Sequence, residues 1–360
     1  MVTKNCNVVG LMSGTSLDGL DIAFCEFRIE ENDITFKIIN ATTYHYSDKE
    51  KQNLNLMNSS AQDLSLADFR FGRFCGEKVA EFLSIHNLRA DFVASHGHTV
   101  FHQPENGFTT QIGNGAAISA ACGLPVVSDF RSMDVCFGGQ GAPLVPVGDL
   151  LLFKNYKYCL NLGGIANISI KQANGGILAF DICPANLVLN KLAEEKGLSF
   201  DDGGLIARSG QVNEKLLEEL NGFEYYSKIS PKSLGKEWVD LVFNPTLNKY
   251  EETAENKLAT VCEHISIQIA KNVQFNGEML VTGGGALNLF LIEKIKEKIQ
   301  IDCKVVIPDI ELIGFKEALI FAFLGYLRIK NQPNALKSVT GASVSSIGGA
   351  IFGNTNNLMR

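Results

Sequence analysis

The sequence has little of what nucleic-acid-binding, membrane-spanning and disulfide-rich proteins require. Its formal net charge is −7, which argues against the basic stripe of a nucleic-acid-binding protein. No apolar run is long enough to span a membrane, and the short run near the first residue is not that of a signal peptide. The nine cysteines include no C-x-x-C pair, so neither a disulfide framework nor a zinc ribbon is indicated. We therefore expect a cytoplasmic protein with no nucleic-acid or membrane partner.

What is present indicates an α/β protein of two domains. The chain has 360 residues, which is more than one hydrophobic core usually serves. Its apolar content of 46% and charged content of 20% are ordinary for a globular protein. The pattern of elements predicts a first domain over residues 1–130 plus about 340–360, and a second over 131–339.

The segment Val8–Phe27 predicts two strands joined by a polar turn. Gly14 and Gly19 give this turn backbone freedom, and successive N–H groups in such a turn can hold a phosphate. Asp18 and Asp21 would repel phosphate but suit a metal ion that carries it. A plain hairpin turn is the alternative for a glycine- and serine-rich loop taken alone.

The same order of elements returns in the second half. The first half continues with a third strand, Ile34–Tyr46. In the second half, strands are predicted at Tyr156–Leu162, Ile165–Lys171 and Ile177–Ile182, with Gly163-Gly164 as the first turn. Strand, glycine turn, strand, turn and strand thus occur twice, which indicates an internal duplication.

Polar side chains follow several predicted strands, the usual place for a site in an open α/β sheet. His96, His98 and His102 follow a strand predicted over Asp91–Ser95. Their spacing is poor for zinc, and a polar sugar-contacting loop is favoured over a metal site, with an ordinary polar loop as the alternative. Asp181 ends the third strand of the second half, where it can face a cleft or cap the next helix.

Two further segments of the second half leave alternatives open. Lys232, Ser233 and Lys236 of SPKSLGKEW can meet a carboxylate or phosphate, and a solvated loop is as good an interpretation. The run Gly283–Gly285 lies between a strand and a helix, an arrangement that can approach a nucleotide or merely allow close packing.

Ten motifs in order along nearly the whole chain resemble the anhydro-N-acetylmuramic acid kinases. They are GLMSGTSLDGLD (Gly10–Asp21), SHGHTVFH (Ser95–His102), QIG (Gln111–Gly113), DFRSMD (Asp129–Asp134), GGQGAPLVP (Gly138–Pro146), NLGGIANI (Asn161–Ile168), PKSLGKEW (Pro231–Trp238), TGGGALN (Thr282–Asn288), KEALIFAFL (Lys316–Leu324) and TGA (Thr340–Ala342). The resemblance implies the sugar kinase and actin superfamily, with two ribonuclease-H-like (actin/hexokinase-type) domains and an interdomain cleft. It is compatible with a homodimer.

The family resemblance also implies a reaction and its residues. ATP phosphorylates 1,6-anhydro-N-acetylmuramic acid while water opens the anhydro ring, as in peptidoglycan recycling. Asp181 is the expected base, since water is a weak nucleophile. The sugar is expected at His96, Thr99, Arg131 and Glu317, and Mg²⁺ at Asp18 and Asp21, either directly or through water. ATP and its phosphates are expected at Gly14, Thr15, Ser16, Leu17, Asp18, Gly19, Leu20, Asp21, Gly163, Gly164, Asn167, Gly283, Gly284 and Gly285.

One departure concerns the loop after Asp181. The family pattern D-x-G-P-G-N stands here as Asp181-Ile182-Cys183-Pro184-Ala185-Asn186, so two glycines are replaced. A positive φ at either position would cost about 1–2 kcal/mol. Two other functions stay open. One is a kinase of an ordinary amino sugar without ring opening. The other, which the altered loop slightly favours, is a nucleotide-gated binding protein without turnover.

Overall fold

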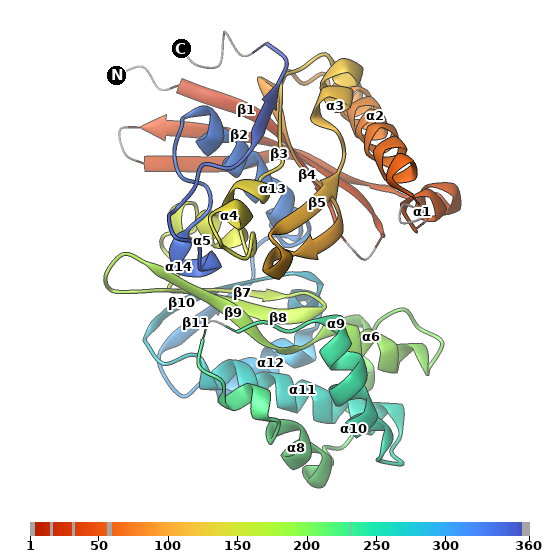
Figure 1. Cartoon of the computed structure of the whole chain (residues 1–360). Helices are drawn as coiled ribbons and strands as arrows, with labels where there is room; N and C mark the ends of the chain where they lie inside the picture. The colour runs from red at the N-terminus through yellow and green to blue at the C-terminus, as the bar shows by residue number, and fades with distance from the viewer. Residues whose placement is uncertain (1–3, 15–16, 31–32, 56–59, 231, 355–360) are drawn as a thin grey trace. The chain divides into compact units, whose positions relative to one another are not determined.

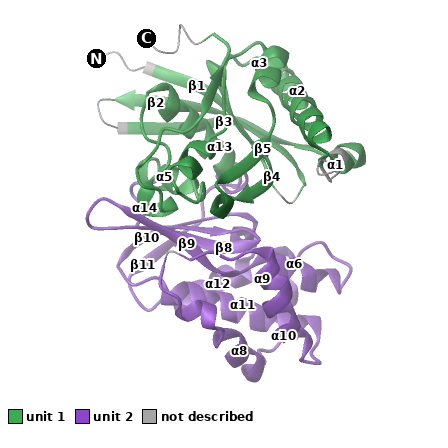
Figure 2. Ribbon diagram, viewed as in Figure 1, with its two compact units in different colours: residues 1–152, 315–360 green, residues 153–314 purple. Residues whose placement is uncertain are grey.

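The computed structural model describes residues 4–14, 17–30, 33–55, 60–230 and 232–354. The chain divides into two compact units, residues 1–152 with 315–360 and residues 153–314 (Figure 2). Residues 131–152 and 315–339, which the sequence placed in the second domain, lie in the first unit. Among the described residues, no helix is long and apolar enough to cross a membrane.

Unit 1 is built on a seven-stranded mixed sheet of order β12-β6-β4-β1-β2-β3, with β5 paired to β4. Its strands are β1 (Lys4–Ser13), β2 (Gly19–Glu30), β3 (Asp33–His45), β4 (Phe92–Gln103), β5 (Phe108–Ile112), β6 (Val126–Ser128) and β12 (Ala350–Phe352). Its helices are α1 (Asp48–Asn55), α2 (Ala61–Ile85), η1 (Pro104–Asn106), α3 (Gly115–Cys122), α4 (Ser132–Cys136), α5 (Val145–Leu151) and α14 (Lys337–Thr340), with α13 (Ile310–Ile329) entering from unit 2.

Helices cover both faces of this sheet. On one face, Val9, Leu11 and Ile22 share a core with α2 and α3 (Figure 1). On the other face α13 packs so closely that a Cβ at Gly10 would lie 1.9 Å from the Ala318 carbonyl oxygen. Glycine is therefore required at position 10 for packing rather than for ligand approach.

Unit 2 repeats the strand order with a five-stranded sheet, β11-β10-β7-β8-β9. Its strands are β7 (Tyr158–Leu162), β8 (Ile165–Lys171), β9 (Ile177–Pro184), β10 (Gly277–Thr282) and β11 (Cys303–Val306). Its helices are α6 (Asn186–Glu194), η2 (Asp202–Gly204), α7 (Leu205–Ser209), α8 (Glu214–Asn221), η3 (Glu224–Ser227), α9 (Lys236–Trp238), the π-helical turn η4 (Val239–Phe243), α10 (Asn244–Asn248), α11 (Ala254–Lys271), η5 (Gly284–Leu287) and α12 (Leu289–Lys298).

The two sheets confirm the predicted duplication. In each, three antiparallel strands in sequence (β1-β2-β3 and β7-β8-β9) are followed by two parallel strands beside the first. The fold is thus α/β with two mixed sheets of one shared topology. This topology, three antiparallel strands and then parallel additions, is that of a ribonuclease-H-like domain.

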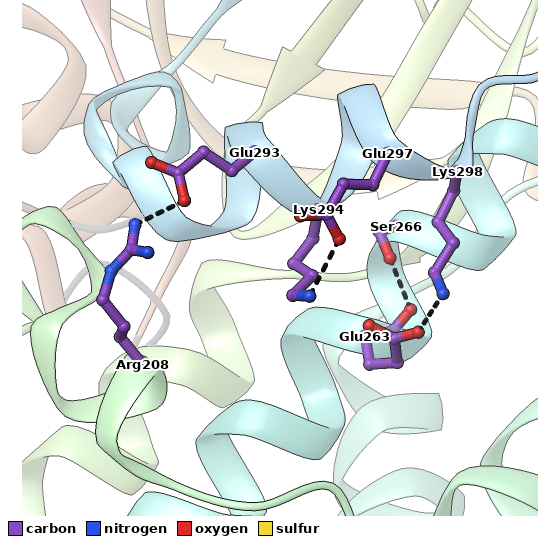
Figure 3. Close-up of polar contacts among 7 residues, drawn as sticks. All are labelled: Arg208, Glu263, Ser266, Glu293, Lys294, Glu297 and Lys298. Carbon is purple, nitrogen blue, oxygen red and sulfur yellow. Dashed lines mark hydrogen bonds and ion pairs between the residues drawn. The ribbon is translucent and has the colours of Figure 1, made fainter.

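In unit 2 the helices gather on one face of the sheet (Figure 1). Ion pairs tie α12 to its neighbours: Arg208 of α7 contacts Glu293 at 2.6 Å, and Lys298 contacts Glu263 of α11 (Figure 3). The Arg208–Glu293 pair is exposed, and an exposed pair contributes at most about 1 kcal/mol. The apolar core between α11, α12 and the sheet therefore holds α12 in place.

Three local predictions need correction. HGHTVFHQ was expected to be a loop after a strand ending at Ser95, but β4 continues to Gln103 because β5 pairs with it. The apolar spacing over Ser65–His86 predicts a helix with Phe69 on its buried face, but Phe69 is 55% exposed on α2. The glycines and prolines of Cys136–Pro146 predict a crossing between domains, but this segment lies within unit 1.

Candidate functional site

The turn between β1 and β2 is held by the end of β3. Leu17 adopts φ +58° and its N–H donates to the Gly14 carbonyl at 3.3 Å. The Asp18 carbonyl accepts from the Tyr46 N–H at 3.3 Å, and a Cβ at Gly19 would lie 2.6 Å from the Tyr44 carbonyl oxygen. Thr15 and Ser16 lie outside the described residues. The side chain of Leu20 belongs to the core, so it cannot itself contact a ligand.

Asp18 and Asp21 differ in their surroundings. Asp18 is exposed, whereas Asp21 is half-buried on β2 and its Oδ1 accepts from the Thr43 hydroxyl at 2.6 Å. Burial raises the pKa of Asp21; the Thr43 bond opposes this, and the negative charge of Asp18 adds to it. Two neighbouring carboxylates, one of them oriented by a hydroxyl, are a donor set that fits Mg²⁺, which usually takes one or two carboxylates and keeps water and phosphate ligands.

Arg131 is held by His96, another residue expected at the sugar. Its Nε and Nη2 lie 3.0 and 2.8 Å from His96 Nε2, and its Nη1 donates to the Gly141 carbonyl at 2.6 Å. Burial, followed by the Arg131 charge, holds the pKa of His96 well below its usual value. Burial also lowers the pKa of Arg131 to about 10, so the guanidinium stays charged at neutral pH. Among the described residues, no carboxylate forms an ion pair with it, which leaves it suited to an anionic ligand.

Glu317 lies on α13, one turn before Phe321, whose ring packs on His96 with centroids 4.5 Å apart. Glu317 is exposed as a residue, yet desolvation by the surrounding protein raises the pKa of its carboxyl group; Arg131 opposes this effect. The preceding residue, Lys316, forms a buried ion pair of 2.7 Å with Asp149 of α5. That pair fixes the start of this part of α13 and with it the position of Glu317.

A cavity of about 250 Å³ lies beside His96 in unit 1. Gln111 lines it and lies 3.4 Å from the Thr99 hydroxyl, and Asp129 lines it with φ +61°, a conformation that is uncommon outside glycine. Side-chain amides, hydroxyls and carboxylates in one cavity suit a polyhydroxylated ligand. The three histidines have separate partners: His98 Nδ1 contacts the Ser13 hydroxyl and His102 Nδ1 the Thr109 hydroxyl. Among the described residues, no metal-binding cluster of three ligands is formed.

In unit 2 a row of polar residues crosses four adjacent strands. Thr282 pairs with Asn161, Asn161 with Asn167, and Asn167 with Asp181. Directly paired residues share one face of a sheet. Their neighbours Leu160 and Leu162 lie on the other face, in the core. The row therefore lies on the face opposite that core.

A bulge in β9 places Asp181 in this row. Ala166 pairs with Cys183 but Asn167 pairs with Asp181, so Ile182 is an extra residue. Both Ile182 and Cys183 can then point into the core while Asp181 points away from it. Burial raises the pKa of Asp181, and its bond from the Leu234 N–H opposes this. The helix-cap alternative is wrong, since Ala185 is the cap residue of α6.

The two glycine segments of unit 2 meet around Asn186. The carbonyls of Gly163 and Gly164 accept from the N–H groups of Asn186 and Leu187, at 3.1 Å each. A Cβ at Gly285 would lie 2.7 Å from Leu162 Cβ and 3.2 Å from Asn186 Oδ1. Gly283 adopts φ +80°, and the turn it makes carries the chain from β10 into η5. The sequence indicates these glycines as candidate nucleotide-binding residues. It does not indicate that Asn161 and Asn186 contact them, although both asparagines lie in the motifs NLGGIANI and Asp181–Asn186.

The chain is similar in sequence to a family of known proteins over most of its length. Residues 6–354 match the family described as "Anhydro-N-acetylmuramic acid kinase". Proteins of that name are 36% identical in Francisella tularensis subsp. novicida (95% of this chain, 97% of the relative) and 35% identical in Aliivibrio fischeri (96% and 98%). The chain belongs to the anhydro-N-acetylmuramic acid kinase family. A solved structure, the activator of the 2-hydroxyisocaproyl-CoA dehydratase from Clostridium difficile with bound ADPNP, aligns at 14% identity and TM-score 0.42 over 88% of this chain and 94% of that one, a distant likeness.

The altered loop of this family member carries no positive-φ strain. In the described part of the chain, neither Cys183 nor Ala185 is among the residues with positive φ, and Ala185 has φ −133°. Both side chains are fully buried. The Ala185 N–H donates to the Gly164 carbonyl at 2.9 Å, so the loop stays tied to the glycine turn. Asp181 and Asn186 are thus held in place although Cys183 and Ala185 replace the two glycines of the family pattern.

Proposed function

We propose that this protein transfers the γ-phosphoryl group of ATP to 1,6-anhydro-N-acetylmuramic acid and opens the 1,6-anhydro ring with water, giving N-acetylmuramic acid 6-phosphate and ADP. Family membership over nearly the whole chain carries this proposal. In the balanced reaction, water adds to the anomeric carbon, the C1–O6 bond breaks, and oxygen 6 takes the phosphoryl group. A residue must accept a proton from the water.

Asp181 is our choice for this base. Its carboxylate lies away from the core on a sheet row of polar residues, and burial raises its pKa toward the range in which a base works near neutral pH. Among the described residues, no cationic side chain forms an ion pair with it, so no counter-charge suppresses its basicity. An oriented base of this kind contributes about 10²–10⁴ in rate.

The glycine segments are proposed to bind ATP. The turn from Gly14 to Asp21, including Thr15 and Ser16, and the turn at Gly163, Gly164 and Asn167 would hold phosphates through backbone N–H groups. Gly283, Gly284 and Gly285 would approach the adenosine. Mg²⁺, held by Asp18 and Asp21, would neutralise charge on the transferred phosphoryl group.

The sugar is proposed to lie against the unit 1 cavity. The guanidinium of Arg131 keeps N–H groups beyond those that His96 and Gly141 use, and its fork suits the lactyl carboxylate of a muramic acid. Glu317 and Thr99 would meet hydroxyl groups. His96 is then assigned to the sugar side through Arg131. Cytoplasmic location and a homodimer belong to the same proposal.

Mass spectrometry of the sugar product tests the function. The protein is incubated with ATP, Mg²⁺ and either the anhydro sugar or reducing N-acetylmuramic acid. We expect the anhydro sugar to gain one phosphoryl group and one water. A gain of a phosphoryl group alone on the reducing sugar would indicate an ordinary amino-sugar kinase, and nucleotide binding with no product would indicate the binding protein.

A further inference from the structure

The segment Lys232–Leu234 lies directly beside Asp181. It belongs to PKSLGKEW, for which the sequence left a ligand contact and a solvated loop open. The Asp181 N–H donates to the Lys232 carbonyl at 3.1 Å. The Leu234 N–H donates to Asp181 Oδ2 at 2.9 Å. The segment therefore holds both the backbone and the carboxylate of Asp181.

Tyr225 adds a third contact from η3. Its hydroxyl donates to the Asp181 carbonyl oxygen at 2.7 Å. The Lys232 ammonium lies 4.7 Å above the Tyr225 ring and donates to the Tyr225 carbonyl at 3.2 Å. The amine of Lys232 is thus engaged with Tyr225, and this engagement joins the two segments that hold Asp181.

Aromatic packing anchors this arrangement. Trp238, four residues after Leu234, packs on Tyr225 with ring centroids 5.7 Å apart and edge-on against Phe223 at 5.4 Å. Phe243, fully buried, packs on Trp238 in turn. A loop fixed at both ends in this way loses little freedom when it holds a side chain.

The contacts treat the two carboxylate oxygens of Asp181 differently. Oδ2 accepts from the Leu234 N–H, whereas no donor within the described ranges reaches Oδ1. A carboxylate with one oxygen bonded and one open has a fixed rotamer and a defined direction for accepting a proton.

We propose that Tyr225 and Lys232–Leu234, here called the Asp181 clamp, are positioning residues that fix Oδ2 so that Oδ1 faces the attacking water. The inference rests on the proposed function, because it assumes that Asp181 is the base. It gives PKSLGKEW a role in the reaction without any contact to ATP or sugar.

Substitution at Leu234 tests the clamp, because proline lacks the N–H group. In the full chain, Leu234→Pro is expected to lower kcat about 10- to 100-fold, as for the loss of a hydrogen bond to a charged group, and to leave the KM for ATP unchanged. The Leu234 bond favours the ionised carboxylate, so its loss should move the acid limb of the kcat–pH profile to higher pH. Leu234→Ala keeps the N–H, and its acid limb should stay at the wild-type pH.

A second pair of variants covers the case in which Leu234→Pro does not fold. Tyr225→Phe removes only the hydroxyl and should lower kcat about 2- to 10-fold without changing the KM for ATP. Tyr226→Phe is the matched control, since that hydroxyl bonds to His264 instead, and it should keep wild-type kcat. Equal kcat for Tyr225→Phe and wild type would overturn the proposal, as would an acid limb that Leu234→Pro leaves in place.

The clamp and the proposed function fail in different ways. Asp181→Asn is measured beside the clamp variants. If the Asp181→Asn variant stays active, Asp181 is not the base, and the clamp then has no catalytic group to position. An inactive one together with fully active clamp variants leaves the proposed function standing and refutes the clamp alone.

Discussion

The Arg131 guanidinium determines which ring nitrogen of the neutral His96 carries the proton. Because a guanidinium only donates, His96 Nε2 must accept its 2.8 and 3.0 Å contacts. The proton then lies on Nδ1, which donates to the Gly97 carbonyl at 2.9 Å. Both ring nitrogens are used within the protein, so His96 can act on a sugar only by orienting Arg131.

We predict that His96→Phe weakens sugar binding and leaves ATP binding intact. Phenylalanine keeps the ring against Phe321 but removes the acceptor for the guanidinium. The KM for the sugar should rise about 10- to 100-fold, since bonds to a charged group are lost. Steady-state kinetics measure both KM values. His102→Phe, at an exposed histidine of the same strand, is the control, and an unchanged sugar KM in His96→Phe would separate His96 from the site.

Asp181→Asn should bind ATP and sugar but lose turnover, by about 10²–10⁴ in kcat. The amide oxygen can still accept from the Leu234 N–H, yet the side chain no longer takes a proton from water. In the wild type, activity should fall as the pH drops through a pKa above the ordinary 3.8 of an aspartate, because the base must be ionised. Calorimetric binding and rapid-quench turnover check the two parts. Lost sugar binding with turnover per bound complex intact would assign Asp181 to binding instead.

The topology was predictable because it depends on local signals. Alternating apolar residues and glycine turns mark β1-β2-β3 and β7-β8-β9, and both meanders have the predicted order. The extent of β4 was missed because His96–His102 is polar; its strand pairing depends on β5, which no local pattern reveals. The apolar run in α13 predicts burial, but it does not reveal that the helix packs on the unit 1 sheet at Gly10.

Candidate site residues can be named from residue type and motif, but the contacts that they make cannot. The Leu234 bond to Asp181 spans 53 positions and the Arg131 bond to His96 spans 35. The bulge at Ile182, which turns Asp181 away from the core, follows from pairing with β8. Such contacts arise from tertiary packing. The functional side chains can therefore be read from the sequence, but their hydrogen-bond partners cannot.

Asp21→Asn should weaken Mg²⁺ use. The half-buried carboxylate, oriented by Thr43, loses its charge, and a divalent cation prefers charged oxygen ligands. We expect the Mg²⁺ concentration for half-maximal activity to rise about tenfold or more, as for the loss of one charged contact. Titration of activity with Mg²⁺ at saturating ATP measures this. Asp91→Asn, at an exposed carboxylate just before β4, should titrate as the wild type does, and equal curves for Asp21→Asn would refute the assignment.

Gly283→Ala and Gly284→Ala separate folding from nucleotide approach. Gly283 has φ +80°, and a Cβ there would lie 2.6 Å from Asn161 Oδ1, so its alanine variant should lose at least about 1 kcal/mol of stability. Gly284 has room, with its nearest neighbour, Asn186 Nδ2, at 3.6 Å. Gly284→Ala should therefore keep the wild-type Tm and raise the KM for ATP. A KM for ATP equal to that of the wild type would show that this run serves packing alone.

His264 should make the protein less stable as the pH falls below about 6.5. It is fully buried on α11, where Nε2 contacts the Tyr226 hydroxyl and Nδ1 contacts Asn221 Oδ1, each at 2.9 Å. Burial lowers its pKa to about 3, so below the ordinary histidine pKa the unfolded chain takes up a proton that the folded chain does not. The free energy of unfolding should then fall by up to about 1.4 kcal/mol per pH unit from this residue, between the two pKa values. Denaturant unfolding at pH 5 to 7 measures the slope. His264→Gln should make this slope smaller, because the unfolded chain then has one imidazole fewer to protonate. Equal slopes for His264→Gln and wild type would show that His264 does not carry this dependence.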